Sequence, residues 1–190
     1  MMNRRGSKNS MALVAVVVAL AFVQCSQYAR GEDKQQPLNA RLTSEAWESL
    51  TAGDHASTIK KVGECIKEFY RDAENMQKDL KAQNVPLPPT GHVDDAAKKK
   101  EILSRGPLND VATCYFIQGK TYLKMAESSP AEKDKREKMA KAKQAFEAAG
   151  RFTYARTYDP NGDPNNDFFW DPAKRSGEII EDTFGPKGQQ

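Results

Sequence analysis

Cysteine and histidine are scarce in this sequence, whose 190 residues include three cysteines and two histidines. Recognisable zinc sites need about four such ligands at short spacings, so we expect no metal site. Two histidines also leave little material for acid–base chemistry at neutral pH. The motifs Gly-x-Ser-x-Gly and His-Glu-x-x-His are missing as well. The sequence therefore predicts a protein that is not an enzyme and needs no cofactor.

Most of the chain has no excess of positive or of negative charge. Four of the 29 basic residues and none of the 26 acidic residues precede Glu32, which leaves 25 basic against 26 acidic residues from there on. A balanced charge offers a polyanion no net electrostatic attraction. We therefore expect no nucleic-acid partner.

Long apolar runs are missing, with one exception near the N-terminus. Residues 3–10 are polar and basic, residues 11–23 form an unbroken apolar run, and small and polar residues follow. This layout is typical of a secretory signal peptide. As a helix the run would reach roughly 20 Å, short of the ~30 Å hydrocarbon core of a membrane. We expect a signal peptide over 1–31, export to the periplasm or out of the cell, and no permanent membrane span in the mature chain.

Small residues of the kind that a signal peptidase selects suggest the cleavage site. Ala29 and Gly31 occupy suitable positions and would release a chain that begins at Glu32, although cleavage nearer Cys25 is an alternative. A lipid anchor at Cys25 is disfavoured, because residues 22–24 lack the small residue and the leucine that usually precede a lipidated cysteine.

Strict alternation of apolar and polar residues, the mark of a strand, is missing throughout, and we predict an all-α fold. The strongest helical pattern lies between Asp54, a capping residue, and Pro86, which cannot continue a helix. Its apolar residues recur at spacings of three and four: Ile59, Val62, Ile66, Phe69, Ala73, Met76 and Leu80. They predict one helix of up to about 30 residues with a continuous apolar seam.

Turn residues divide the mature chain into five segments. In order, we expect a polar lead-in over 32–42, a first helical hairpin over 43–84, a Pro-rich spacer with a short helix over 85–107, a second helical hairpin over 108–158, and a turn-rich loop with a C-terminal capping helix over 159–190. Residues 108–126 are apolar around most of the helix circumference, which predicts a central helix. A helical pattern also continues over 152–158.

The two hairpins resemble tetratricopeptide repeats. In the second, Tyr115, Gly119 and Tyr122 stand where the first helix of that repeat carries an aromatic residue, a glycine and a tyrosine, and Ala142, Phe146 and Ala149 match its second helix. Tyr122 and Ala142 are 20 residues apart, where the repeat has about 9, so an insertion lengthens both helices. The resemblance implies a short stack of hairpins that binds a protein or peptide and catalyses nothing.

Aromatic side chains are the candidate contacts for a partner. The main hypothesis places a protein segment in a groove between Trp47, the long helix that carries the seam, and the 108–126 helix. The candidate contact residues are Trp47, Tyr70, Tyr115, Tyr122, Tyr154, Tyr158 and Trp170. One alternative is a glycan that stacks on the aromatic cluster over 152–170. Another is a homodimer zipped along the apolar seam.

Two further patterns resemble a disulfide pair and a calcium loop, and each has a simpler explanation. Cys65 and Cys114 form a candidate disulfide, although each also lies in an apolar helical pattern, where cysteine serves as a small buried apolar residue. Residues 159–167 alternate oxygen-bearing side chains as a calcium loop does. Pro164 and Trp170, however, occupy the positions that need glycine and glutamate, so we expect an ordinary turn there.

Overall fold

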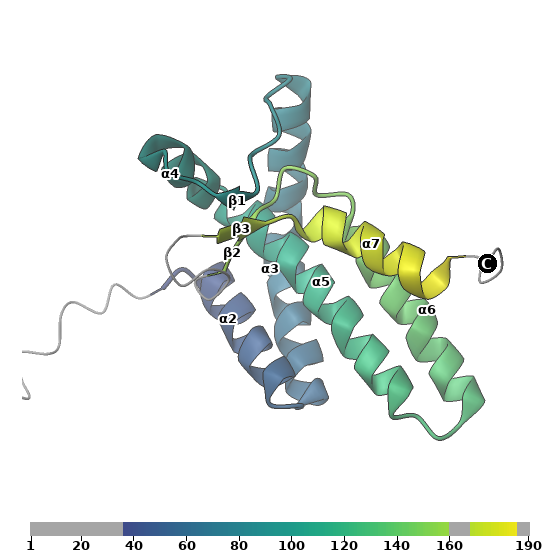
Figure 1. The fold of residues 1–190 in the computed structure, drawn as a ribbon. Helices are drawn as coiled ribbons and strands as arrows, with labels where there is room; N and C mark the ends of the chain where they lie inside the picture. The colour runs from purple at the N-terminus through teal and green to yellow at the C-terminus, as the bar shows by residue number, and fades with distance from the viewer. Residues whose placement is uncertain (1–35, 160–167, 186–190) are drawn as a thin grey trace, which may run out of the picture. The chain divides into compact units, whose positions relative to one another are not determined.

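Six α-helices and three short strands make up the described part of the computed structural model, residues 36–159 and 168–185 (Figure 1). Helices account for 73% of these residues, which confirms the predicted all-α class. All of these elements lie within one unit, Pro37–Gln190. The predicted signal peptide over 1–31 lies outside the described residues. None of the described helices is both long and apolar enough to cross a membrane.

The first hairpin consists of α2 (Leu38–Thr51) and α3 (His55–Ala82). α2 begins inside the segment that was predicted as a polar lead-in. The reason is that Asn39 and Leu42 extend the buried stripe of this helix by one more turn, and the Thr43 hydroxyl donates to the Asn39 carbonyl at 3.0 Å. A buried asparagine hides this stripe from a hydropathy pattern, which is why the sequence placed the helix start too late.

α3 follows the sequence prediction closely. The Asp54 carboxylate accepts a hydrogen bond from the Ser57 amide at 3.0 Å and caps the helix, which then runs for 28 residues. Its apolar seam packs inside the chain: Ile66 joins the core cluster shared with α2 and α5, and Leu80 joins a second cluster with α5. Within one chain, Val62 and Ala73 of the seam are fully buried and its other residues are half-buried.

α4 (Ala96–Ser104) and α5 (Gly106–Glu127) follow the spacer. Pro107 lies in the first turn of α5, where a missing amide hydrogen costs nothing. This proline therefore belongs to the start of the helix and is not part of the preceding spacer. Half of the 22 residues of α5 are buried, and α5 packs against α2, α3, α6 and α7. These contacts confirm the prediction of a central helix.

α6 (Glu132–Ala149) and α7 (Pro172–Phe184) complete the helical stack. α6 returns along α5, as Figure 1 shows, and the two approach closely at Gly119, where a Cβ would lie 2.6 Å from the Phe146 ring. α7 begins after the cap residue Asp171, as predicted, and packs against α6 and α5. It therefore takes the place of the predicted capping helix.

A small antiparallel sheet was not predicted. Its strands are β1 (Gly91–His92), β2 (Thr157–Asp159) and β3 (Phe168–Trp170), with β3 in the middle. The helical pattern predicted over 152–158 was wrong, because α6 ends at Ala149 and the chain turns into β2. Strands of two or three residues are too short to show an alternating pattern.

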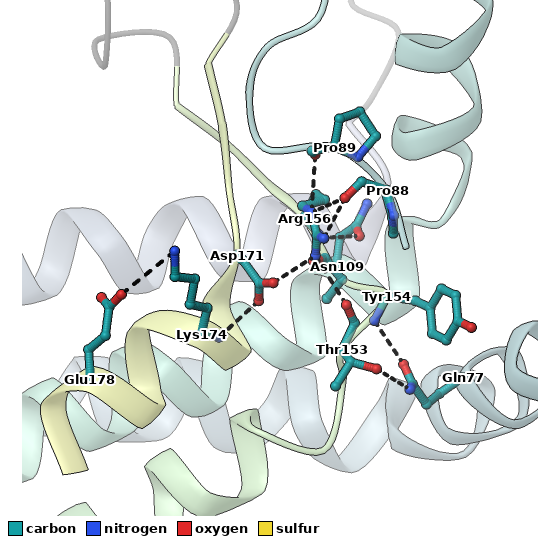
Figure 2. Close-up of polar contacts among 11 residues, drawn as sticks. Gln77, Pro88, Pro89, Asn109, Thr153, Tyr154, Arg156, Asp171, Lys174 and Glu178 are labelled. Atoms are coloured by element: carbon teal, nitrogen blue, oxygen red, sulfur yellow. Dashed lines mark hydrogen bonds and ion pairs between the residues drawn. The ribbon is translucent and has the colours of Figure 1, made fainter. Parts of the chain in front are cut away.

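One buried arginine, Arg156, joins three segments that are distant in sequence (Figure 2). Its guanidinium lies 3.1 Å from the carboxylate of Asp171 at the start of α7. Its Nε donates to the carbonyls of Pro88 and Pro89 in the spacer, at 2.9 and 3.1 Å. It also donates to the Thr153 carbonyl in the turn after α6, at 3.1 Å. The spacer, this turn and α7 are thereby held around one charge.

The surroundings of Arg156 offset the cost of burying it. The side chain is 4% exposed, and this burial lowers the pKa of Arg156 while Asp171 opposes the shift. Arginine nonetheless stays charged, so the cost of removing it from water is offset by the ion pair and by the carbonyl acceptors. The Arg156 amide also donates to the Asn109 side chain at 2.9 Å, which fixes the turn to α5.

The contact between Gly119 and Phe146 gives a test of the α5–α6 packing. Gly119→Ala would push a methyl group into the fully buried Phe146 ring, and we expect it to lower the free energy of unfolding by about 1–3 kcal/mol. Gly63→Ala in α3 is the matched control, because a Cβ there meets nothing within 4 Å. It should raise the free energy of unfolding by about 0.5–1 kcal/mol. Urea unfolding measures both changes, and equal effects would contradict the packing.

Candidate binding site

The central helix α5 presents two different sides to its surroundings. Tyr115, Gln118 and Tyr122 follow one another at spacings of three and four and therefore lie on one side of the helix. Lys120 precedes Tyr122 by two residues, about 200° around the helix, and faces nearly the opposite way. All four side chains are half-buried. Each side is therefore a candidate contact surface.

The tyrosine side forms a shallow pocket between α5 and α6, called here the α5–α6 pocket. Its volume is about 280 Å³, and it is lined by Tyr115, Gln118, Tyr122, Lys141, Gln144 and Ala145. Two of these residues, Tyr115 and Tyr122, were predicted as partner contacts from the sequence. The structure brings them together at one site.

The polar groups of the pocket are available for hydrogen bonds. The amides of Gln118 and Gln144 have no hydrogen-bond partner in the described part of the chain, and each offers two donors and an acceptor. Burial raises the pKa of Tyr115, so its phenol stays neutral and can donate. The Lys141 ammonium pairs with Glu137 at 2.7 Å and stands 5.9 Å from the centre of the Tyr122 ring. The pocket is thus close to neutral and rich in neutral donors and acceptors.

Aromatic contacts continue from the pocket toward α3. The Tyr115 ring stacks on Phe152 with centroids 6.2 Å apart and an interplanar angle of 17°. Phe152 meets Tyr70 edge-on, also at 6.2 Å, and the Tyr70 hydroxyl donates to Glu74 at 3.2 Å. Phe152 is 3% exposed, whereas the two tyrosines are half-buried. Tyr70, a third predicted contact, therefore adjoins the Tyr115 end of the pocket.

The remaining predicted contacts lie elsewhere. Tyr154 and Trp170 are 8% and 7% exposed, and the Tyr154 hydroxyl donates to the Val85 carbonyl at 2.8 Å. They close the core and offer no free ring face. Tyr158, at 40%, is the most exposed of the described rings in the cluster that was considered for a glycan. Trp47 lies against the other side of α5, beside Lys120.

The polar half of the pocket was not predicted from the sequence. Lys141 and Gln144 belong to no motif and lie in a helix whose exposed face is mostly polar. Gln118 could have been found, because it stands three residues after Tyr115 and four before Tyr122 and so shares their side of the helix.

The candidate disulfide pair lies in the core between α2, α3 and α5. Cys65 and Cys114 are buried as free thiols, and the Thr43 hydroxyl contacts their sulfurs at 3.9 and 3.4 Å. The Asn39 amide donates to Asp110 nearby, and burial raises the pKa of that carboxyl. A hydrogen bond with Cys65, together with burial, raises the pKa of Cys114 well above its usual range. The structure therefore brings the two thiols into contact but keeps Cys114 protonated.

Metal binding finds no support in the described part of the chain, where no group of three or more His, Cys, Asp or Glu side chains is placed to hold an ion. Most of the calcium-like turn, residues 160–167, lies outside the described residues.

Comparison of the chain with protein-family models, with curated proteins and with solved structures found no match. The chemistry of the site therefore carries the functional conclusion.

Burial of the thiols predicts slow alkylation of the folded protein. We expect iodoacetamide to leave Cys65 and Cys114 unmodified in folded residues 32–190, over a time that alkylates both in denaturant after reduction, because thiolate and access are both required. Peptide mass spectrometry reads out each site, and rapid modification of the folded chain would contradict the structure. Unfolding without reductant then tests the predicted disulfide, since a bonded pair is alkylated only after reduction.

Proposed function

We propose that this chain is an exported, non-enzymatic binding protein that holds a segment of a protein partner in the α5–α6 pocket. The observation that carries the proposal is that Tyr115 and Tyr122 line one pocket together with two amides, which have no hydrogen-bond partner among the described residues. Tyrosine is the residue type that most often combines large apolar contact with hydrogen bonding at interfaces. Export rests on the N-terminal apolar run over 11–23.

The size and the chemistry of the pocket favour a peptide segment over a small cofactor. A volume of about 280 Å³ is at the lower limit for small-molecule sites, and it suits one or two side chains of a longer ligand. The amides of Gln118 and Gln144 match the alternating donors and acceptors of an extended backbone. The tyrosine rings supply flat apolar faces beside them.

The arrangement of the helices supports the same proposal. α2 with α3, and α5 with α6, are helical hairpins that pack on one another through α3 and α5. The likeness of 108–158 to a tetratricopeptide repeat implies that such hairpins bind protein segments on a shared surface. Burial raises the pKa of Asp110, a shift that is common among catalytic acids. The Asp110 carboxylate, however, accepts a hydrogen bond from Asn39 on α2 and does not line the α5–α6 pocket. This favours binding over catalysis.

A displayed peptide library, panned on residues 32–190, tests the proposal. Selected peptides should lose affinity by about tenfold or more in Tyr122→Ala, because truncating a central aromatic contact removes much of the binding energy. Tyr158→Ala is the matched control, since Tyr158 is exposed and does not line the pocket. It should change the Kd less than twofold. Fluorescence polarisation with labelled peptides measures both variants.

Two results would count against the peptide proposal. Selected peptides that bind Tyr122→Ala as tightly as the unmodified chain would place the binding surface elsewhere. Failure to select any peptide, combined with glycan-array binding that Tyr122→Ala abolishes, would assign the pocket to a glycan.

A further inference from the structure

The second side of α5 carries a cation, Lys120, that lies against aromatic rings. Lys120 is half-buried, and its ammonium stands 6.0 Å from the centre of the Trp47 ring and 5.8 Å from that of Phe116. It forms no ion pair with any residue that the structure describes. The charged groups that act on it are Lys124, one turn further along α5, and Arg175 of α7, both positive.

Several lysines that are more exposed than Lys120 do have a counter-charge. Lys60, Lys78 and Lys141 each face a glutamate one turn away on the same helix. Around Lys120, burial and repulsion by the two neighbouring cations lower its pKa. Three neighbouring cations that pair with no carboxylate among the described residues cost stability, and such costs are typical of sites built for a ligand.

Aromatic rings lie beside two of these three cations, Lys120 and Arg175. Trp47 packs against Phe116 with centroids 6.3 Å apart, and Phe116 packs against Trp170 at 4.9 Å. The Arg175 guanidinium lies 5.3 Å from the centre of the Trp170 ring. The rings attract Lys120 and Arg175 by cation–π interaction, which neutralises no charge and so leaves the attraction for an anion in place.

We propose that Lys120, Lys124 and Arg175 form a second binding site, which takes an acidic peptide segment. Lys120 and Lys124 are about 6 Å apart along the helix axis, so they suit carboxylates spaced along a chain better than a single compact anion. The partly exposed Trp47 ring offers an apolar surface for the aliphatic parts of glutamate side chains. The site lies on the opposite side of α5 from the α5–α6 pocket and is independent of the function proposed for that pocket.

The chain carries its own reporters for this site. It has two tryptophans, and each lies under one cation of the cluster: Trp47 under Lys120 and Trp170 under Arg175. Titration of residues 32–190 with hexaglutamate should change the tryptophan fluorescence to saturation, and hexaglutamine should not. The apparent Kd should rise with salt, because the attraction is between charges.

Variants separate this site from general surface charge. Lys120→Gln should weaken hexaglutamate binding about tenfold, the loss expected for one charge-assisted contact, and Lys120→Arg should retain it. Lys60→Gln removes one positive charge from an exposed position on α3 and should change the Kd less than twofold. Should Lys120→Gln not fold, Lys124→Gln tests the same cluster from an exposed position.

Three results would overturn the proposal. One is equal binding of hexaglutamate and hexaglutamine. Another is a loss of affinity in Lys60→Gln that equals the loss in Lys120→Gln or, if that variant does not fold, in Lys124→Gln. The third is displacement of hexaglutamate by an equal concentration of inorganic phosphate, which would assign the cluster to a free anion.

Discussion

The buried guanidinium of Arg156 is the constraint on which the arrangement of the non-helical segments depends. A charge that is 4% exposed is tolerable only if its donors are satisfied, and this one needs the spacer, the turn after α6 and Asp171 to be in place together. The same segments lead into the paired strands β1, β3 and β2, and Phe152 and Tyr154 of the turn are buried in the core. Their mutual dependence on one charge explains how a chain with a long Pro-rich spacer adopts a defined path.

The same interaction positions α7, and through it one of the two proposed binding sites. Asp171 caps α7 through the Lys174 amide at 3.0 Å while its second oxygen pairs with Arg156. α7 then carries Arg175 over the Trp170 ring. The α5–α6 pocket depends instead on the close approach of two helices at Gly119. α5 is common to both sites, so one rigid helix would present a neutral pocket on one side and a cationic surface on the other.

The sequence allowed the regular elements to be predicted and left the irregular ones hidden. α3 and α7 were predicted because periodicity and the caps Asp54 and Asp171 are local signals. The sheet was missed because its pairing depends on strands of two or three residues far apart in the chain. Arg156 gave no signal, since an arginine in a polar segment is normally a surface residue. Within the site, the tyrosines were predicted as contacts because of their residue type. The glutamines and lysines could be assigned to a site only after the packing of neighbouring helices was known.

Hydrogen exchange of the Arg156→Lys variant tests the role of this residue most directly. Lysine keeps the charge but cannot donate along the several directions of the guanidinium fork. Compared with the unmodified chain, amides in β1 and α7 should exchange faster, while those in the middle of α3 and α5 should keep their protection. Arg151→Lys, at an exposed position, is the control and should leave exchange unchanged. Unchanged protection of β1 and α7 in Arg156→Lys, or an equal loss across all helices, would contradict the account.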